Sequence, residues 1–490
     1  MSNTSLSHEE LLPDLQGSFE DFGEKCGVFA VFEPDSNVAL TTYNGLYALK
    51  HRGQDAAGQV VGDEYGELFI YKDLGSVQDV FKDGEALPLL LPSIGRMAIG
   101  HNRYGTMARV PTQERWHAAQ PIKGQKNNFA GAYNGDVSNI RRIMSQHEFS
   151  TDSYVSDTEG VIKLIDLYMS RSQEPTLINA LHQVLPQLEG AYSGVFTDGK
   201  RIVGVRDPNG FRPFVYGQTA TGGHVLASEV RALDESGAEF KYEVAPGTMI
   251  IIDEKGVHTE RFAKDCSTPC MYEYFYFSKE DNIFHNQKVG DVKSRFGEEL
   301  AREHPIDADL VVGVPNSGIT AAEAYAKALN LPYIQAVTKN KNRESDLRSF
   351  LANNQNEREA IALAKFLIDG IEVKDKSIVV VDDSVIRGTV SRVLIQMLRE
   401  AGATSVHVRV PAPIYKYSCY YGMDTGRAEE LLATSRNLSE MCETIGADSL
   451  EFLSPAGVVK AVQRPMGKIC IACATGEYPT EVPVTLLSHK

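Results

Sequence analysis

Apolar residues change their spacing near the middle of this chain, and the change predicts two differently built halves. In the first half, short apolar runs are separated by turn residues, which predicts strands. The predicted strands are 27–32, 97–100, 191–196, 201–205 and 247–253. Helical spacing interrupts them at 44–51 and 158–169, and the second helix follows the capping sequence Ser156-Asp-Thr-Glu159. Many strands with few helices predict an α+β sandwich from residue 26 to about 260.

From about residue 290, strands and helices alternate, which is the pattern of a parallel sheet covered by helices. The predicted helices are 293–303, 319–329 and 390–401, and the predicted strands are 309–314, 333–337, 378–381 and 404–410. We place the boundary between the halves near Cys266 and Cys270. The predicted division is an arm 1–25, a sandwich 26–265, an α/β domain 266–465 and a tail 466–490. The polar segment 340–358 is predicted to be a mobile functional loop, because long loops inside compact domains usually carry function.

Bulk composition narrows the class of protein. The 490 residues exceed the ~250–300 at which one hydrophobic core stops growing, so two domains are expected. Hydrophobic residues make up 42% and charged residues 23%, as in soluble globular enzymes. The net charge of −16 argues against nucleic acid as a partner, and no apolar run approaches the ~20 residues of a membrane span.

The N-terminal arm and the cysteines indicate the compartment. Residues 1–25 lack the basic start and the apolar stretch of a secretory signal, so we expect a cytoplasmic protein with a polar, poorly ordered arm. The seven cysteines are odd in number and clustered in position. They therefore predict thiols with chemical or metal-binding roles and not a disulfide framework.

Two adjacent carboxylates, Asp382 and Asp383, directly follow the apolar run 378–381. Such an unbroken run is typical of a buried parallel strand, so the pair is expected at the carboxyl end of that strand. There it can hold ribose hydroxyls and a hydrated Mg²⁺. The small residues that follow can turn backbone N–H groups toward a phosphate at the start of the next helix. The alternative is an acidic turn that only caps this helix.

The whole phrase from Ser377 to Arg392 resembles the phosphoribosyl pyrophosphate (PRPP) loop of the type I phosphoribosyltransferases. A second phrase, residues 311–322, looks like the pyrophosphate loop of the same family. Where that family has Pro-Asp-Ser-Gly, this chain has Asn316 in place of the Asp, and its loop after Lys339 is only partly preserved. The resemblance implies PRPP contacts from Ser317, Lys339, Asp382, Asp383, Ser384, Arg387, Gly388 and Thr389, with Mg²⁺ held by Ser317, Asp382 and Asp383.

Five phrases in the first half come in the order found in the N-terminal nucleophile glutamine amidotransferases. They are His51-Arg-Gly-Gln-Asp-Ala-Ala-Gly58, Gly100-His-Asn-Arg-Tyr-Gly-Thr106, Ala132-Tyr-Asn-Gly-Asp136, Ser156-Asp-Thr-Glu159 and Val205-Arg-Asp-Pro-Asn-Gly-Phe-Arg-Pro213. The two resemblances together imply an α+β N-terminal nucleophile hydrolase-type sandwich followed by an α/β type I phosphoribosyltransferase domain.

Hydrolysis of the glutamine side-chain amide needs a nucleophile, a proton acceptor and a hydrogen-bond donor to the oxyanion. It also needs residues that bind the α-amino and α-carboxylate groups. The resemblance implies that Cys26 is the nucleophile, and that the Asn134 side chain and the Gly135 N–H bind the oxyanion. It implies that Arg103 holds the carboxylate of glutamine and Asp157 its ammonium group. If residues 1–25 are removed, the free α-amino group of Cys26, with a pKa of about 8, can serve as the base.

The sequence also allows purely structural roles for the same residues. The cysteine can be a structural residue of a strand, the Arg–Asp pair can lie on the surface, and Asn134-Gly135 can form a hairpin turn. Tyr133 and Asp136 also depart from the Ala-His-Asn-Gly-Asn expected in the family, but neither change removes the expected oxyanion donors.

Four cysteines match the thiolates that hold a [4Fe–4S] cluster in one branch of the amidotransferases that use both glutamine and PRPP. They are Cys270, Cys419, Cys470 and Cys473, the last two in a C-x-x-C. Four thiolates would also suit zinc. Cys266, only four residues before Cys270, is the rival first ligand, and Cys442 has helical spacing that predicts packing alone.

Together the resemblances imply transfer of ammonia from glutamine to C1 of PRPP, which gives 5-phosphoribosylamine, glutamate and pyrophosphate and opens de novo purine synthesis. We further expect purine nucleotides as feedback inhibitors and a homo-oligomer, with neither nucleic acid nor a membrane as a partner. One rival is a diverged relative with another metabolic role, because residues 278–282 read Ser-Lys-Glu-Asp-Asn where the family has an Ala-Arg-Pro-Asp-Ser-like phrase. The other is a non-catalytic iron–sulfur regulator. The candidate catalytic residues are all present, which argues against this second rival.

Overall fold

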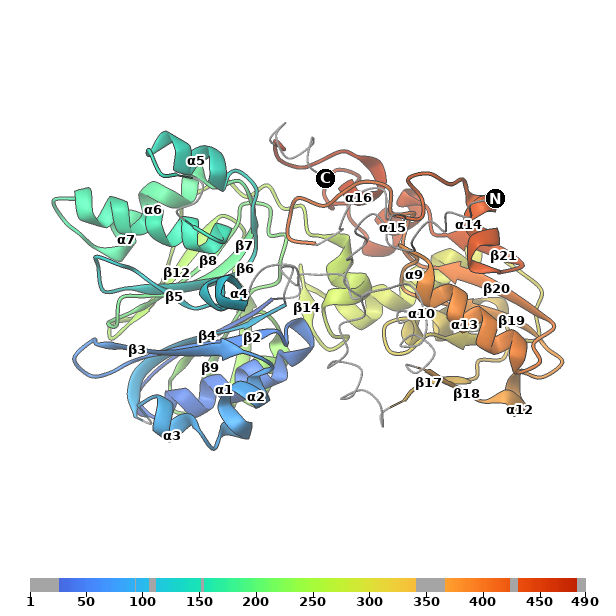
Figure 1. Cartoon of the computed structure of the whole chain (residues 1–490), viewed down its shortest axis with the longest axis horizontal. Coiled ribbons are helices and arrows are strands. Elements are labelled where there is room, and N and C mark those ends of the chain that lie inside the picture. The colour runs from blue at the N-terminus through green and yellow to red at the C-terminus, as the bar shows by residue number, and fades with distance from the viewer. Residues whose placement is uncertain are drawn as a thin grey trace, which may run out of the picture.

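The computed structural model describes residues 26–92, 94–104, 112–150, 154–340, 366–423 and 431–482. Two units lie side by side (Figure 1). Strands between residues 27 and 261 build the first unit, and parallel strands between 310 and 452 build the second. The predicted arm 1–25 lies outside the described residues, and so does the predicted loop 340–358 from residue 341 onward.

Two antiparallel sheets face each other in the first unit. Their strand orders are β11-β9-β10-β1-β4-β2-β3 and β13-β12-β8-β7-β6-β5. The first sheet contains β1 (Gly27–Ser36), β2 (Ala56–Gly62), β3 (Leu68–Leu74), β4 (Gly95–Arg103), β9 (Val215–Thr219), β10 (His224–Ala227) and β11 (Ala238–Glu243). The second contains β5 (Ile122–Lys123), β6 (Ala130–Val137), β7 (Gly190–Thr197), β8 (Ile202–Arg206), β12 (Thr248–Asp253) and β13 (Gly256–Arg261). An apolar core fills the space between the sheets.

Helices cover the outer faces of both sheets, so the predicted α+β sandwich is confirmed. On the first sheet lie α1 (Val38–Ala48), α2 (Val77–Phe81), α3 (Leu87–Leu90) and α8 (Val230–Glu235), with α4 (Thr112–His117) beside β3. On the second lie α5 (Ile140–Gln146), α6 (Asp157–Arg171) and α7 (Leu177–Val184). The predicted start of a helix at residue 44 was wrong, because Asn37 caps α1 seven residues earlier and its Oδ1 accepts the Leu40 N–H at 3.1 Å.

The second unit is a four-stranded parallel sheet with helices, as the alternating pattern predicted. Its order is β16-β19-β20-β21, formed by β16 (Leu310–Gly313), β19 (Ser377–Val381), β20 (Ser405–Val410) and β21 (Ser449–Phe452). Its helices are α9 (Val289–Glu303), α10 (Ile319–Leu329), α12 (Gly370–Val373), α13 (Thr389–Glu400), α14 (Leu438–Ile445), α15 (Pro455–Val462) and α16 (Ala472–Thr475). Two short ribbons add β14 (Ile283–Phe284) with β15 (Gln287–Lys288), and β17 (Val337–Lys339) with β18 (Phe366–Ile368).

The prediction of a strand at 333–337 was wrong. Only Tyr333 pairs with the sheet, through a single bridge to Val311, and the regular strand β17 begins at Val337 and belongs to a separate ribbon. The side chain of Gln335 takes the place of ladder hydrogen bonds, since its Nε2 donates to the carbonyl oxygens of Gly313 at 3.0 Å and Val337 at 2.5 Å.

The two units touch through residues distant in sequence. The rings of Phe211 and Tyr421 stack with centroids 4.4 Å apart, and Ala191, Cys470 and Ala472 join them in one buried cluster. This places the C-terminal C-x-x-C segment against the first unit, where α16 lies between the two units in Figure 1.

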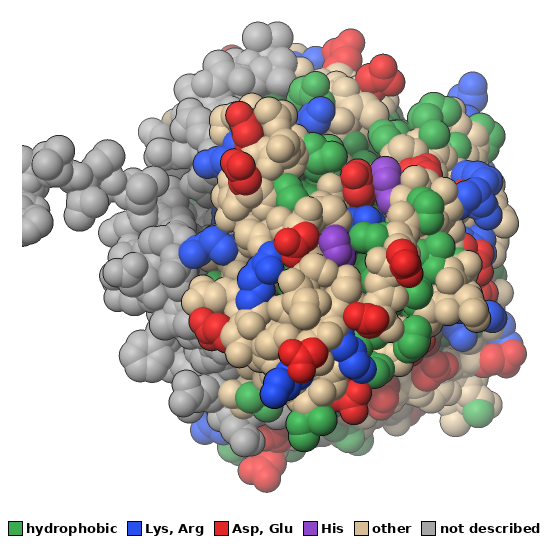
Figure 2. Space-filling view, turned by 90° about the vertical axis from the view of Figure 1, so that its right-hand side faces the viewer, with side chains coloured by type: hydrophobic (Ala, Val, Ile, Leu, Met, Phe, Trp, Pro, Cys, Tyr) green, Lys and Arg blue, Asp and Glu red, His purple; other side chains and the backbone are tan. Residues whose placement is uncertain are grey.

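The exposed surface of the second unit carries charges of both signs. Figure 2 shows acidic and basic side chains interspersed over its end face, with hydrophobic side chains in small groups between them. Across the described ranges, no helix is both long and apolar enough to cross a membrane.

Candidate active sites

Strand register places three of the predicted glutamine-site residues around one end of the sandwich. The inward side chains of β1, β4 and β6 that fill the inter-sheet core are Val28, Ala30, Phe32, Met97, Ile99, Ala130 and Ala132. Because side chains alternate along a strand, Cys26, Arg103 and Asn134 continue these inward rows. The pairing of Gly27 with Asn102 brings the start of β1 to the end of β4, so Cys26 and Arg103 lie at the same edge.

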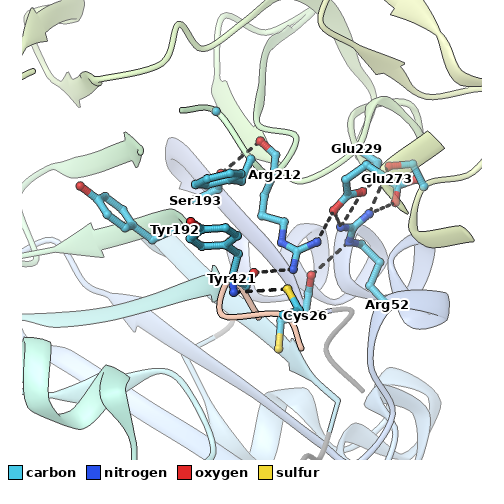
Figure 3. A network of polar contacts seen from close by, with 12 residues as sticks. Cys26, Arg52, Tyr192, Ser193, Arg212, Glu229, Glu273 and Tyr421 are labelled. Carbon is cyan, nitrogen blue, oxygen red and sulfur yellow. Dashed lines mark hydrogen bonds and ion pairs between the residues drawn. The ribbon is translucent and has the colours of Figure 1, made fainter. Parts of the chain in front are cut away.

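Cys26 is buried, and its backbone carbonyl is held by an arginine. Arg52 Nε donates to the Cys26 carbonyl oxygen at 3.0 Å, while its two terminal nitrogens bind Glu229 at 2.5 Å and Glu273 at 2.8 Å (Figure 3). Burial lowers the pKa of Arg52, but the carboxylates of Glu273 and Glu229 outweigh that effect and raise it. Sequence reasoning assigned no role to Arg52, although it stands in the matched phrase that begins at His51.

Asn134 and Gly135 lie inside β6, so the alternative of a hairpin turn is wrong. They pair with Ser193 and Tyr192 of β7, and Gly135 has a φ of 140°. A Cβ at this glycine would stand 1.9 Å from the carbonyl oxygen of Ala191, so a larger residue does not fit. Asn134 Nδ2 is buried without a hydrogen-bond partner in the described structure. A buried donor without a partner is costly, and a developing oxyanion would satisfy it.

Asp157 opens α6, and a tyrosine on β6 holds its carboxylate. Asp157 Oδ2 accepts the Tyr133 hydroxyl at 2.5 Å and the Val137 N–H at 3.1 Å. Burial raises the pKa of Asp157, and these hydrogen bonds and the charge of Arg103 oppose the rise. The departure from the family at Tyr133 therefore acts directly on the residue expected to hold the ammonium of glutamine.

We expect Tyr133→Phe to raise the KM for glutamine about 10-fold with little change in kcat, because a hydrogen bond to a charged group contributes about 1.5–3 kcal/mol. The same hydroxyl lowers the pKa of Asp157, and a protonated carboxyl no longer holds the ammonium. The loss of glutamine affinity as pH falls should therefore begin at higher pH in the variant. Steady-state kinetics across pH measure both effects. Tyr168→Phe, which removes a hydroxyl from α6, the helix that begins at Asp157, is the control, and an equal change there would contradict the assignment.

A histidine that sequence reasoning left without a role also faces the inter-sheet core. His101 is fully buried, and neither ring nitrogen has a hydrogen-bond partner in the described structure. Burial, with the positive charge of Arg103, lowers its pKa to about 3, so the ring is neutral at physiological pH. The sequence feature that could have indicated it is its position two residues before Arg103, which puts both side chains on the same face of a strand.

In the second unit, parallel pairing brings the two predicted phosphate loops together. Gly313 of β16 pairs with Val381 of β19, so the loops after both strands leave the sheet at the same edge. Ser317 Oγ donates a hydrogen bond to Asp383 Oδ2 across that edge. A Cβ at Gly318 would lie 2.6 Å from the carbonyl oxygen of Val381, so the close approach of the loops requires glycine there.

The acidic pair stands between β19 and α13 as expected. The Asp383 N–H donates to Asp382 Oδ1 at 2.9 Å, and Ser384 Oγ donates to Asp383 Oδ1 at 2.6 Å. Gly388, with a φ of 80°, caps α13, and in the described structure no side chain caps that helix. The alternative of an acidic helix cap is therefore wrong, and the α13 start at Thr389 stays open to an anion.

Two other predicted PRPP contacts, Arg387 and Lys339, stand on different elements. Arg387 is partly buried and directly precedes the cap of α13. Lys339 ends β17 and pairs with Phe366, so it belongs to the separate two-stranded ribbon and not to the four-stranded sheet.

The four predicted cysteine ligands come from three segments that the fold brings together. Cys270 and Cys470 form a bridge in which the Met271 N–H donates to the Cys470 carbonyl oxygen at 3.2 Å. The Lys416 N–H donates to the Cys473 carbonyl oxygen at 2.8 Å, three residues before Cys419. Burial raises the pKa of the Cys270, Cys470 and Cys473 thiols, and the negative charges of neighbouring thiolates raise it further.

The rival ligand Cys266 and the packing residue Cys442 lie elsewhere. Cys266 is exposed and its Sγ contacts the Lys264 carbonyl oxygen at 3.6 Å, while Cys442 packs in α14. Within the described ranges, no set of three His, Cys, Asp or Glu side chains is close enough to hold a metal ion as it stands. The donor chemistry of two buried and two half-buried thiols nevertheless suits a metal that prefers sulfur.

Comparison with known proteins covers almost the whole chain. A glutamine amidotransferase domain family matches residues 107–235, and a phosphoribosyl transferase domain family matches residues 279–424. The amidophosphoribosyltransferase of Synechococcus elongatus is 36% identical over 95% of this chain and 94% of its own length. That of Bacillus subtilis is 37% identical over 98% of both chains.

A solved structure shares the same architecture. The B. subtilis glutamine PRPP amidotransferase complexed with ADP and GMP superposes with a TM-score of 0.83, at 38% identity, over 94% of this chain and 98% of that one. Identity above one third along both units, with the glutamine-site and phosphate-loop residues arranged as described, shows that the chain belongs to the amidophosphoribosyltransferase family.

Proposed function

We propose that this chain releases ammonia from glutamine at Cys26 and transfers it to C1 of PRPP. The products are 5-phosphoribosylamine, glutamate and pyrophosphate, in the first step of de novo purine synthesis. The observation that carries the proposal is that one chain contains both a glutamine site and a PRPP site. The buried, unpartnered Asn134 Nδ2 continues an inward row of one sheet of the sandwich and Cys26 an inward row of the facing sheet, and the paired Ser317 and Asp383 stand at the sheet edge of the second unit.

At the glutamine site, Arg103 and Asp157 hold the carboxylate and ammonium of the substrate. The Cys26 sulfur attacks the amide carbon, and the proton of the thiol passes to the α-amino group of the same residue. Asn134 Nδ2 and the Gly135 N–H receive the oxyanion. The amino group returns the proton to the departing ammonia, and water then hydrolyses the thioester to glutamate.

At the second site, the loops after β16 and β19 bind PRPP at the helix starts of α10 and α13. Ser384, Arg387, Gly388 and Thr389 form the loop that receives the phosphate, and Lys339 approaches from the β17–β18 ribbon. Oxygen ligands of the kind that Ser317, Asp382 and Asp383 offer suit Mg²⁺, which would neutralise charge on the pyrophosphate. Ammonia forms the bond to C1 as the bond from C1 to pyrophosphate breaks.

One assay tests the reaction. Purified protein given glutamine, PRPP and Mg²⁺ should release glutamate and pyrophosphate in equal amounts, and should release pyrophosphate from PRPP with ammonia alone. Glutamate release without pyrophosphate release would contradict the proposal.

Removal of the arm is part of the proposed mechanism, because the α-amino group of Cys26 is free only after cleavage. We expect the intact mass of the active protein to lack residues 1–25. Edman sequencing should begin Cys-Gly-Val-Phe. Full glutaminase activity in protein that still carries Met1 would contradict this prediction.

We further propose that Cys270, Cys419, Cys470 and Cys473 hold a [4Fe–4S] cluster. Its support is the convergence of four thiols from three segments, and the cluster would join these segments structurally. Protein purified without air should be brown and contain about four irons per chain. Cys270→Ser should lose the metal and Cys266→Ser should keep it. One zinc per chain without visible absorption would replace the cluster with a zinc site.

Four further properties are proposed with this function. The chain divides into the arm 1–25, the glutaminase 26–265, the phosphoribosyltransferase 266–465 and the tail 466–490. Purine nucleotides inhibit the enzyme, by analogy with the ADP and GMP of the B. subtilis complex. The enzyme assembles as a homo-oligomer and works in the cytoplasm.

A further inference from the structure

Arg212 is an arginine whose side chain is almost completely buried, with an exposed fraction of 1%. It stands in the last of the five phrases that resemble the amidotransferases. Its Nη1 donates to Glu273 Oε1 at 3.2 Å, and its Nη2 donates to the Tyr421 carbonyl oxygen at 2.7 Å (Figure 3). The third nitrogen, Nε, is buried without a hydrogen-bond partner in the described structure. A buried donor without a partner is costly, so this nitrogen indicates an acceptor that the described part of the chain does not supply.

Two of the four candidate cysteine ligands lie beside Arg212. The Cys270 N–H donates to the carbonyl oxygen of Phe211, the residue before Arg212, at 3.3 Å. The Tyr421 N–H donates to Cys419 Sγ at 3.3 Å, and Tyr421 is also the residue whose carbonyl oxygen Arg212 binds. Arg212 is therefore fixed on both sides to segments that carry a candidate ligand.

The charges of these thiols and of the guanidinium act on one another. Burial raises the pKa of the Cys270 thiol, and the positive charge of Arg212 is the largest effect that opposes the rise. Burial lowers the pKa of Arg212, but the negative charges of Cys270 and Glu273 outweigh that effect and raise it. Cys419 acts on the pKa of Arg212 in the same direction as Cys270. Because such interactions weaken with distance, the guanidinium lies close to both sulfur atoms.

The spacing of the four thiols suits a cluster better than a single ion. Burial raises the pKa of the Cys473 thiol, and the negative charges of the other three candidate ligands raise it further, so all four lie near one another. Within the described ranges, however, no three such side chains are close enough to hold one metal ion. A zinc ion holds each sulfur ligand at about 2.3 Å from one centre, whereas an iron–sulfur cluster separates its ligands by the width of its own core. The four thiols therefore favour the larger group.

We propose that Arg212 is a charged hydrogen-bond donor to the iron–sulfur cluster. Its unpartnered Nε donates to sulfur, and its Nη2 fixes Tyr421, whose N–H donates to Cys419. Positive charge and hydrogen bonds to sulfur both favour the more negative, reduced state of such a cluster. Arg212 therefore makes the cluster harder to oxidise. The inference rests on the cluster proposed above.

The first test uses the wild-type protein. Protein purified without air from cells supplied with ¹⁵N-labelled arginine is frozen, its cluster is reduced to a paramagnetic state, and electron–nuclear double resonance is recorded. We expect a coupling from the nitrogen of one arginine, which should be absent from Arg212→Lys. A wild type that contains about four irons per chain but shows no arginine coupling would overturn the proposal, because Nε would then bind another group, such as water.

The second test measures how fast oxygen bleaches the visible absorption of the cluster. Arg212→Gln removes the charge and should bleach about 10-fold faster, a change of the size expected for one hydrogen bond to a charged group. Arg212→Lys keeps the charge without the Nε donor and should fall between Arg212→Gln and the wild type. The midpoint potential should fall in the same order. Wild-type bleaching in both variants, at wild-type iron content, would overturn the proposal, and if neither variant retains iron, the labelled wild type still decides.

Arg409→Lys is the matched control. Arg409 is also buried, and its Nη1 donates to the Val408 carbonyl oxygen and to Ser449 Oγ, each at 3.0 Å. This variant should bleach at the wild-type rate, and an equal acceleration there would overturn the proposal, because the loss of any buried arginine would then suffice. A wild type without iron would refute the cluster, and this inference with it. A wild type that holds iron and forms phosphoribosylamine, yet shows no arginine coupling, would overturn only the role of Arg212.

Discussion

Cys26→Ala is expected to abolish glutamine-dependent synthesis of phosphoribosylamine, with a loss of at least about 10⁴-fold, because the variant has no nucleophile. Ammonia-dependent synthesis should continue at the wild-type rate, since PRPP binds in the other unit. Parallel assays of pyrophosphate release with glutamine and with ammonium salt measure the two activities. Cysteine and alanine have similar volumes, so the fold should tolerate the change at this buried position.

The contrast between the two nitrogen sources makes this result specific. Cys442→Ala, in α14, removes a half-buried thiol that donates to the Ala447 carbonyl oxygen and should leave both activities intact. Equal loss of glutamine- and ammonia-dependent synthesis in Cys26→Ala would contradict the separation of the two half-reactions.

Asp383→Asn should reduce synthesis from both nitrogen sources, by about 100-fold or more. The buried carboxylate of Asp383 accepts hydrogen bonds from Ser317 and Ser384 and would share in binding Mg²⁺. An amide keeps the shape but offers one acceptor fewer and no charge, so the loops lose both their connection and their metal ligand. The rate of pyrophosphate release as a function of PRPP and Mg²⁺ concentration measures the loss.

Asp309→Asn is the matched control for the acidic pair. Asp309 is exposed at the opposite end of the same sheet, where its Oδ2 accepts the Ser377 N–H at 2.8 Å. This variant should keep normal kinetics. Wild-type PRPP kinetics in Asp383→Asn would refute the assignment of the pair to the substrate.

The elements of the second unit were largely predictable because their patterns are local. The run 378–381 is apolar on both faces and became β19, and the helix predicted at 319–329 is α10. That residues 333–337 do not form a strand of the sheet was not predictable. Its apolar residues resemble a strand, but Gln335 satisfies carbonyl groups that a strand would leave to its neighbour.

The candidate sites were predictable where a residue type itself carries the chemistry, as in Cys26 or the acidic pair. Arg52 was not, because an arginine in a helical turn gives no sign that it will be fully buried. Its partners Glu229 and Glu273 are about 180 and 220 residues away and are defined only by tertiary packing. Tyr133 could be recognised as unusual from the sequence, but its effect on Asp157 required the position of α6 against β6.

The return of the C-x-x-C segment to Cys270 has a consequence for synthesis of the protein on the ribosome. All strands of the sandwich are encoded before residue 262, so this unit can fold while translation continues. The core of the second unit contains both Met271 and Ile471, so it cannot close until translation has passed that point. The nascent chain should therefore expose part of the apolar core of the second unit, Met271 included, until Ile471 has emerged.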